Sequence, residues 1–135
     1  MTATMSRPPR QRGFTLIELM TVALVVSVLA AIALPQYKNA IRHSQEAVLR
    51  ENLYRMRDLI DQYYADKGKY PASLETLVEE GYLRKLPKDP MTGQPDWQTE
   101  LAEMDPDNPG EAPGIYNVKS ASPESSLAGT PYAEW

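Results

Sequence analysis

The sequence contains no cysteine, and this absence excludes several kinds of chemistry. Disulfides cannot close its loops, and neither zinc–thiolate sites nor cysteine nucleophiles are possible. Histidine is almost as scarce, because His43 is the single example and no fixed spacing joins it to a catalytic partner. A membrane-anchored enzyme or sensor would need a cluster of nucleophile, base or metal ligands. We find no such cluster in the sequence and expect a protein that is not an enzyme.

Positive charge is also in short supply. The chain has 14 Lys and Arg against 18 Asp and Glu, for a net charge of −4. Three of the basic residues, Arg7, Arg10 and Arg12, stand at the N-terminus, so the remainder is more acidic than the whole. An acidic body gives no electrostatic basis for binding nucleic acid. A chain of 135 residues has room for one small domain besides an anchor.

One long apolar run is present, at residues 14–34, and Glu18 is the only acidic residue in it. At about 1.5 Å per residue, a helix of this length matches a bilayer core of about 30 Å. A charged side chain in the bilayer costs about 2.5–3.5 kcal/mol on insertion scales. A plain anchor has no reason to carry that cost. We interpret Glu18 as a residue that finds a cationic partner within the membrane.

The three N-terminal arginines predict the orientation of this segment. Basic residues beside an apolar helix stay in the cytoplasm, so the chain after Leu34 is expected outside the inner membrane. An ordinary secretory signal is the alternative, with cleavage after Ala33 and a mature chain that begins at Leu34. Glu18 and the length of the apolar run disfavour that alternative.

The residues around Glu18 also resemble a known signal. Residues 12–19, Arg-Gly-Phe-Thr-Leu-Ile-Glu-Leu, look like the class III signal of type IV pilins and type II secretion pseudopilins. The resemblance implies that a prepilin peptidase cuts between Gly13 and Phe14, and that Phe14 is then N-methylated. It also implies that Glu18 pairs with the methylated amine of Phe14 on a neighbouring subunit during assembly. Pro35 stands where the family has a proline, and we expect it to kink the helix or open it locally.

Beyond Pro35 the pattern becomes amphipathic and predicts that the helix continues to about residue 66, before Gly68 ends it. The expected apolar stripe consists of Tyr37, Ile41, Val48, Leu49, Leu53, Met56, Ile60 and Tyr63. The expected polar faces carry Arg42, Glu46, Arg50, Glu51, Arg55, Arg57, Asp58 and Asp61. The spacing favours ion pairs of Glu46 with Arg50 and of Glu51 with Arg55.

The sequence after the long helix is expected to form a short helix and short strands. Ser73 can cap a helix over residues 73–80 that Gly81 ends, and strands are expected near residues 96–100 and 114–120. Residues 69–77, 81–83 and 86–90 resemble the major, G-type pseudopilin of type II secretion. The expected fold is therefore α+β and type IV pilin-like, with a long N-terminal helix packed on a small antiparallel sheet. Tyr132 and Trp135 are expected to pin the irregular C-terminal segment, residues 120–135.

The resemblance implies a calcium site in this C-terminal segment, because the G pseudopilins hold that ion there with oxygen ligands. Here no aspartate lies beyond Gly110, and Glu124 is the one carboxylate among serines. We expect a serine-rich surface loop and no cofactor, with calcium bound by Glu124 and Ser126 as the alternative.

An acidic cluster in another loop, Asp105, Asp107 and Glu111, is expected to be a solvated turn, with a contact to another pseudopilin or to cargo as the alternative.

These residues predict three parts: a cytoplasmic prepilin leader (1–13), a transmembrane and assembly helix (14–34), and a periplasmic pseudopilin domain (35–135). The resemblance implies a structural subunit of the type II secretion pseudopilus, which drives protein export through the outer membrane. Its implied partners are further copies in a homo-oligomeric filament, other pseudopilins, the prepilin peptidase, and the inner-membrane assembly platform and ATPase. A type IV pilus subunit for adhesion, motility or DNA uptake is the alternative, which the missing cysteines and the G-like middle disfavour.

Overall fold

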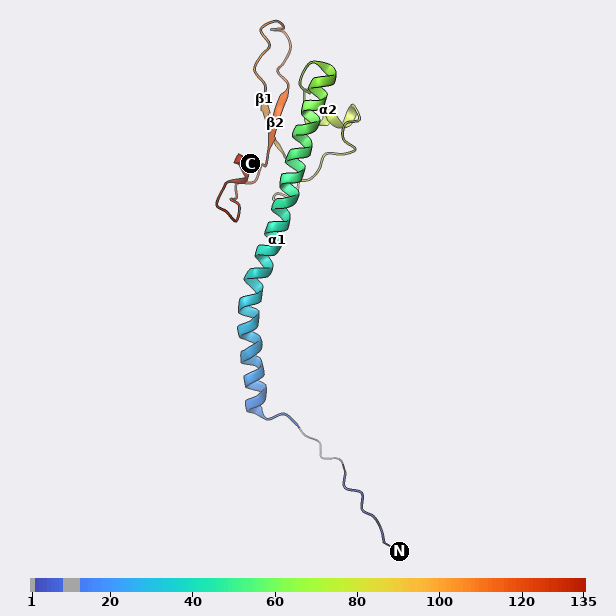
Figure 1. The fold of residues 1–135 in the computed structure, drawn as a ribbon, viewed down its shortest axis with the longest axis vertical. Helices are drawn as coiled ribbons and strands as arrows, with labels where there is room; N and C mark the ends of the chain where they lie inside the picture. Colours follow the sequence, from blue (N-terminus) through green and yellow to red (C-terminus); the bar gives the residue numbers. More distant parts are fainter. Residues whose placement is uncertain (1, 9–12) are drawn as a thin grey trace. The chain divides into compact units, whose positions relative to one another are not determined.

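A long helix, two short strands and two short helical segments make up the computed structural model, which describes residues 2–8 and 13–135 (Figure 1). Helix α1 runs over Leu16–Lys67 and is followed by α2 at Leu74–Glu79. Strands β1 (Gln98–Leu101) and β2 (Ile115–Lys119) come next, and the 3-10 helix η1 (Tyr132–Glu134) is last. Two compact units are distinguished, Met1–Lys38 and Asn39–Trp135.

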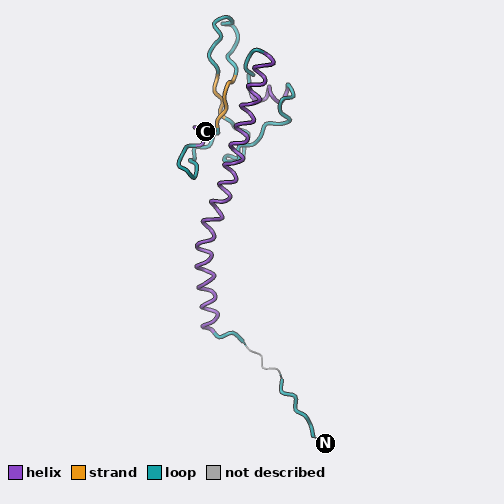
Figure 2. Tube along the Cα trace, viewed as in Figure 1, coloured by secondary structure: helices purple, strands orange, loops and turns teal. Residues whose placement is uncertain are grey.

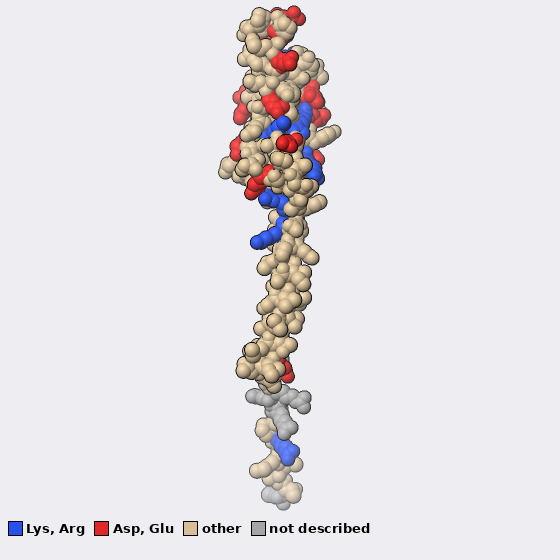
Figure 3. Space-filling view, turned by 90° about the vertical axis from the view of Figure 1, so that its left-hand side faces the viewer, with Lys and Arg blue, Asp and Glu red and all other residues tan. Residues whose placement is uncertain are grey.

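The first unit contains the apolar part of α1. Its large apolar side chains are exposed, including Ile17, Leu24, Val26, Leu29 and Ile32. On the face shown in Figure 3, this stretch carries no blue or red side chain except one acidic group near its start. Within the described residues, α1 is the one helix long and apolar enough to cross a membrane.

The second unit is built on the later part of α1, whose buried side chains recur every three or four residues. The buried core consists of Leu49, Leu53, Met56, Ile60, Tyr63, Leu74, Leu77, Trp97, Ile115, Val118 and Tyr132. The predicted stripe is correct from Leu49 onward. It is wrong for Tyr37, Ile41 and Val48, which are exposed, because residues of the C-terminal half cover only one narrow face of the helix.

Local signals end α1 and begin α2 as expected. Gly68 takes a positive φ of 72° and donates its N–H to the carbonyl of Tyr64, which a glycine does at little steric cost. The side chain of Ser73 accepts from the N–H of Thr76 and caps α2. Helix α1 continues through Pro35, so the helix does not open there in this structure.

Strands β1 and β2 pair antiparallel beside α1 (Figures 1 and 2). Thr99 lies opposite Val118, and the register shifts between Glu100 and Leu101. Just before β2, the backbone of Gly114 approaches that of Tyr70 so closely that a Cβ would lie 2.5 Å from the Tyr70 carbonyl oxygen. The structure thus confirms the predicted α+β arrangement of a long helix on a small antiparallel sheet.

Candidate functional site

The start of α1 is organised by Thr15. Its hydroxyl accepts from the N–H of Glu18 at 3.2 Å, and its carbonyl accepts from the N–H of Leu19 at 3.1 Å. Thr15 therefore acts as the helix cap. The hydroxyl of Thr21, farther along the helix, donates to the carbonyl of Ile17 at 2.8 Å.

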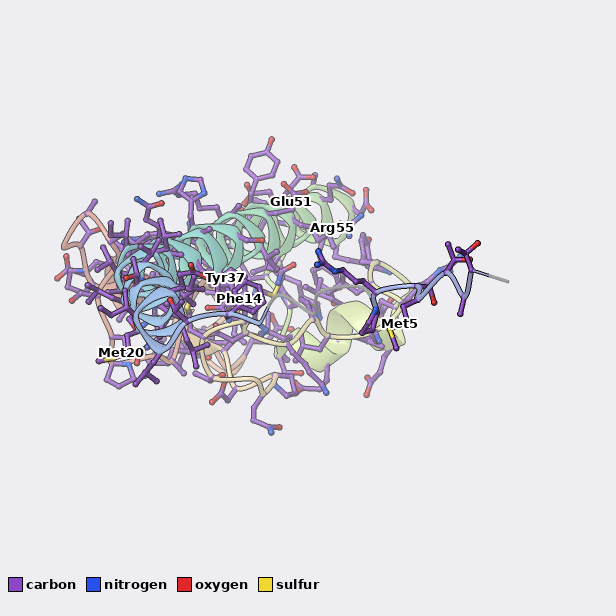
Figure 4. All side chains as sticks on the ribbon, turned by 90° about the horizontal axis from the view of Figure 1, so that it is seen from below. Met5, Phe14, Met20, Tyr37, Glu51 and Arg55 are labelled. Carbon is purple, nitrogen blue, oxygen red and sulfur yellow. The ribbon has the colours of Figure 1, made fainter. Side chains whose placement is uncertain are left out.

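Gly13 and Phe14 precede this cap, and both lie in an exposed, non-helical stretch. The side chain of Phe14 is 88% exposed and projects at the beginning of α1 (Figure 4). Glu18 is exposed one turn later, in the first turn of the helix, where the helix dipole favours a negative charge. Arg10 and Arg12, two of the predicted cytoplasmic arginines, lie outside the described residues.

The C-terminal segment folds back on itself as a tight turn. Ser126 and Thr130 exchange main-chain and hydroxyl hydrogen bonds, including Ser126 N–H to the Thr130 carbonyl at 2.7 Å. Ser125 forms an antiparallel bridge with Pro131. The aromatic end then packs inward, because Tyr132 is fully buried and meets Trp135 edge to face, with ring centroids 5.1 Å apart. The expectation that Tyr132 and Trp135 pin this segment is confirmed.

Glu46 of α1 holds this turn. Its carboxylate is only 5% exposed, and one oxygen accepts both the N–H of Leu127 and the hydroxyl of Tyr132, each at 2.8 Å. Burial alone would raise the pKa of Glu46, but these hydrogen bonds, with Arg50 and His43 nearby, hold that pKa below its ordinary value. Burial and the same carboxylate raise the pKa of Tyr132 to about 12. Glu46 is thus a buried anion and not the exposed partner of Arg50 that we expected.

Arginines of α1 hold the rest of the segment. Arg42 forms an ion pair with Glu124 at 2.9 Å, and Arg50 lies 4.5 Å from the centre of the Trp135 ring. Arg57 donates to the main-chain oxygens of Val118 and Trp135, at 2.9 and 2.5 Å. The second predicted ion pair, Glu51 with Arg55, does not form, although both side chains point outward from α1 (Figure 4).

The two residues that would hold calcium in the alternative interpretation therefore have other partners. Glu124 is paired with Arg42, and the Ser126 hydroxyl is 2.7 Å from that of Thr130. Calcium takes six to eight oxygen ligands with carboxylates among them. Over residues 2–8 and 13–135, no group of three His, Cys, Asp or Glu side chains lies together as a metal site would require. The side chains present do not fit the ion.

A buried aspartate and serine support the start of the C-terminal segment. Asp89 and Ser120 are both fully buried, and the Ser120 hydroxyl donates to Asp89 at 2.5 Å. The other Asp89 oxygen accepts from the N–H of Met91, as in a turn that begins at an aspartate. Ser120 in turn accepts from the N–H of Ser122. These polar groups are satisfied internally, so their burial is explained by structure.

Strands β1 and β2 carry a cluster of charged and polar groups around Glu100. Lys119, Asn117 and Tyr116 all donate to its carboxylate, and these hydrogen bonds lower the pKa of Glu100 to about 2.

In the β1–β2 loop, Asp105 accepts from the N–H of Asp107 as an exposed turn would. His43 is exposed.

The important residue that sequence reasoning misplaced is Glu46. A signal for it existed, because the buried positions Leu49, Leu53, Met56 and Ile60 alternate steps of four and three. One further step of three back along the helix reaches Glu46, on the same face. A single carboxylate in line with an apolar stripe is a candidate for a buried, hydrogen-bonded anion.

Comparison with known proteins gives two kinds of similarity. A family model described as the prokaryotic N-terminal methylation motif matches residues 8–34. Over 134 residues the chain is 30% identical to the type II secretion system core protein G of Escherichia coli K12, covering 87% of this chain and 86% of that protein. This chain belongs to the type II secretion system core protein G family.

Further relatives agree with this family. The core protein G of Klebsiella pneumoniae is 28% identical over 87% of this chain and 91% of its own length. The type IV major fimbrial protein FimA of Dichelobacter nodosus is 46% identical, but over only 44% of this chain and 37% of its own length. No solved structure matches the chain at a significant level. Membership of the core protein G family and the apolar helix α1 indicate a membrane-anchored pseudopilin.

Proposed function

We propose that this chain is a structural subunit of a type II secretion pseudopilus, the short filament that drives protein export through the outer membrane. The observation that carries the proposal is similarity to core protein G along almost the whole chain. The match to the methylation motif and the exposed apolar surface of α1 support it, because such a surface suits a lipid bilayer or the interior of a helical filament.

Processing comes first in this function. Residues 1–13 form the leader, the prepilin peptidase cuts between Gly13 and Phe14, and the new amino group of Phe14 is methylated. The geometry supports cleavage at this point, since both residues are exposed and lie before the Thr15 cap. A peptidase can therefore bind an extended strand there without unwinding α1.

Assembly then depends on Glu18. Its carboxylate pairs with the methylated amine of Phe14 on a neighbouring subunit, and residues 14–34 leave the bilayer for the filament core. Opposite charges attract strongly where water is excluded, whereas a charge buried without a partner is costly. The exposure of Glu18 in the first turn of α1 supports this role. Pro35 marks the point where the helix can loosen when it packs in the filament.

The remaining partners follow from the same proposal. The leader faces the cytoplasm and residues 35–135 form the periplasmic domain, with other pseudopilins beside it. The inner-membrane platform and ATPase supply the mechanical work, so the chain contributes packing surfaces and no catalysis. The core protein G relatives support this division, because their names describe components of a secretion system.

A type IV pilus subunit is the second candidate. The fimbrial relatives favour it, with up to 46% identity, but their similarity covers less than half of this chain. The core protein G relatives cover up to 87% of it, which makes the pseudopilus the better supported function.

Mass spectrometry of the chain purified from membranes tests the processing step. We expect a mature N-terminus at Phe14 that carries one added methyl group, and loss of this product in cells without the peptidase. A Gly13→Pro variant should remain uncut, and Thr21→Ala, farther along α1, should be processed normally. A mature chain that begins at Leu34 would instead establish the secretory-signal alternative and overturn the proposal.

A further inference from the structure

The C-terminal segment, residues 120–135, requires contacts with the rest of the domain to keep a single conformation. It is irregular apart from the 3-10 helix η1, and the chain contains no cysteine that could close it covalently. An irregular segment keeps one conformation only if its contacts offset the conformational entropy lost on ordering it. Some group outside the segment must therefore fix it to the domain.

Glu46 meets that requirement. The carboxylate lies 81 residues before Leu127 and 86 before Tyr132 in the sequence, yet it accepts hydrogen bonds from both. Hydrogen bonds to an ionised acceptor are about twice as strong as neutral ones. Glu46 and Tyr132 are both buried, so opening the segment would leave a buried anion without its donors.

Three arginines at steps of eight and seven residues along α1 extend this contact. Arg42 pairs with Glu124, Arg50 lies over the Trp135 ring, and Arg57 reaches the main-chain oxygen of Trp135. The indole N–H of Trp135 donates in turn to the Thr130 hydroxyl at 3.0 Å. One side of the helix thus holds the segment from residue 124 to residue 135.

These contacts also disfavour the binding of a cation at the C-terminal segment. The only carboxylate of the turn, Glu124, is already neutralised by Arg42, and a divalent ion beside Arg42 and Arg50 would be repelled. We propose that Glu46, with its arginine neighbours, holds the C-terminal segment in this chain and that the segment folds without calcium. The family resemblance had implied calcium there, so this chain departs from its relatives at this position. The proposal concerns folding and does not depend on the filament function.

The test is limited proteolysis of the full chain in detergent micelles, in calcium and in a calcium chelator. Chymotrypsin can cut after the exposed Leu127 when the segment opens, and mass spectrometry identifies the fragment. We expect the same cleavage rate in both solutions for wild type. We expect Glu46→Ala to be cut at least about tenfold faster, because cleavage follows the open population.

Two further variants separate the Glu46 contact from general damage. Tyr132→Phe removes only the hydroxyl that donates to Glu46, and it should also be cut faster, even if Glu46→Ala fails to fold. Glu51→Ala removes an exposed carboxylate of the same helix and should match wild type. Protection of wild type by calcium by tenfold or more would overturn the proposal. So would wild-type cleavage rates for Tyr132→Phe and any soluble Glu46→Ala protein.

Discussion

Two carboxylates of α1 show how environment decides the role of one residue type. Glu18 is exposed on an apolar stretch, in the first turn of the helix. Glu46 is buried in the second unit, where Leu127 and Tyr132 supply donors from the same chain. A buried anion without donors would be strongly destabilising, so Glu46 depends on the donors from Leu127 and Tyr132.

The lowered pKa of Glu46 predicts a pH-dependent stability. Because the folded-state pKa lies below its ordinary value of 4.5, Glu46 contributes stability above that pH. The contribution is lost as the pH falls through the folded-state pKa. Glu46→Gln should therefore lower the melting temperature at pH 7 by roughly 5 °C, and by much less near pH 3.

Thermal unfolding of the full chain in detergent, at a series of pH values, measures this difference. Glu51→Gln is the matched control, since Glu51 is exposed on the same helix and its variant should follow wild type throughout. A Glu46→Gln deficit that stayed constant from pH 7 to pH 3 would mean that the charge of Glu46 does not matter.

At the scale of elements, the domain depends on places where backbones meet closely. The N–H of Ile115 donates to the carbonyl of Pro71, and the adjacent Gly114 leaves no space for a side chain against Tyr70. This contact ties the start of β2 to the segment between α1 and α2. It is a point at which a single methyl group forces the backbone to move.

Gly114→Ala should therefore lower the free energy of unfolding by about 1–3 kcal/mol. Gly110→Ala is the control, because no heavy atom of the described residues, apart from Gly110 and its two chain neighbours, lies within 4 Å of the position its Cβ would take. It should change stability by less than about 0.5 kcal/mol. Urea unfolding of both variants measures the difference, and equal stability would show that the Tyr70 backbone yields freely.

The elements themselves could be predicted from local signals, but their contacts could not. Gly68 marked the end of α1, Ser73 marked the start of α2, and apolar positions marked β2. The register of β1 on β2 and the place of Glu46 depend on residues far apart in the sequence. For the same reason, the exposure of Ile41 and Val48 was not foreseen, since it depends on which narrow face of α1 the C-terminal half covers.

At the scale of the whole molecule, the two units differ in the surfaces that they present. The first presents an apolar helix whose only acidic residue is near its start, and the second is a small domain with its own core. The family was predictable because its signal is a continuous stretch, residues 12–19, that needs no tertiary contact to be recognised. The means of holding the C-terminal segment was not, because Glu46 lies 81 residues before Leu127 and 86 before Tyr132 in the sequence.

The role of Glu18 in assembly is tested most directly by counting filaments and secreted cargo in cells whose only copy of this chain is Glu18→Ala. We expect normal cleavage after Gly13 and normal membrane anchoring, but about tenfold fewer filaments and correspondingly less secretion. Thr21→Ala, which changes another polar residue of the apolar stretch, should assemble as wild type does. Filaments and secretion at wild-type levels in Glu18→Ala cells, with processing intact, would contradict the account.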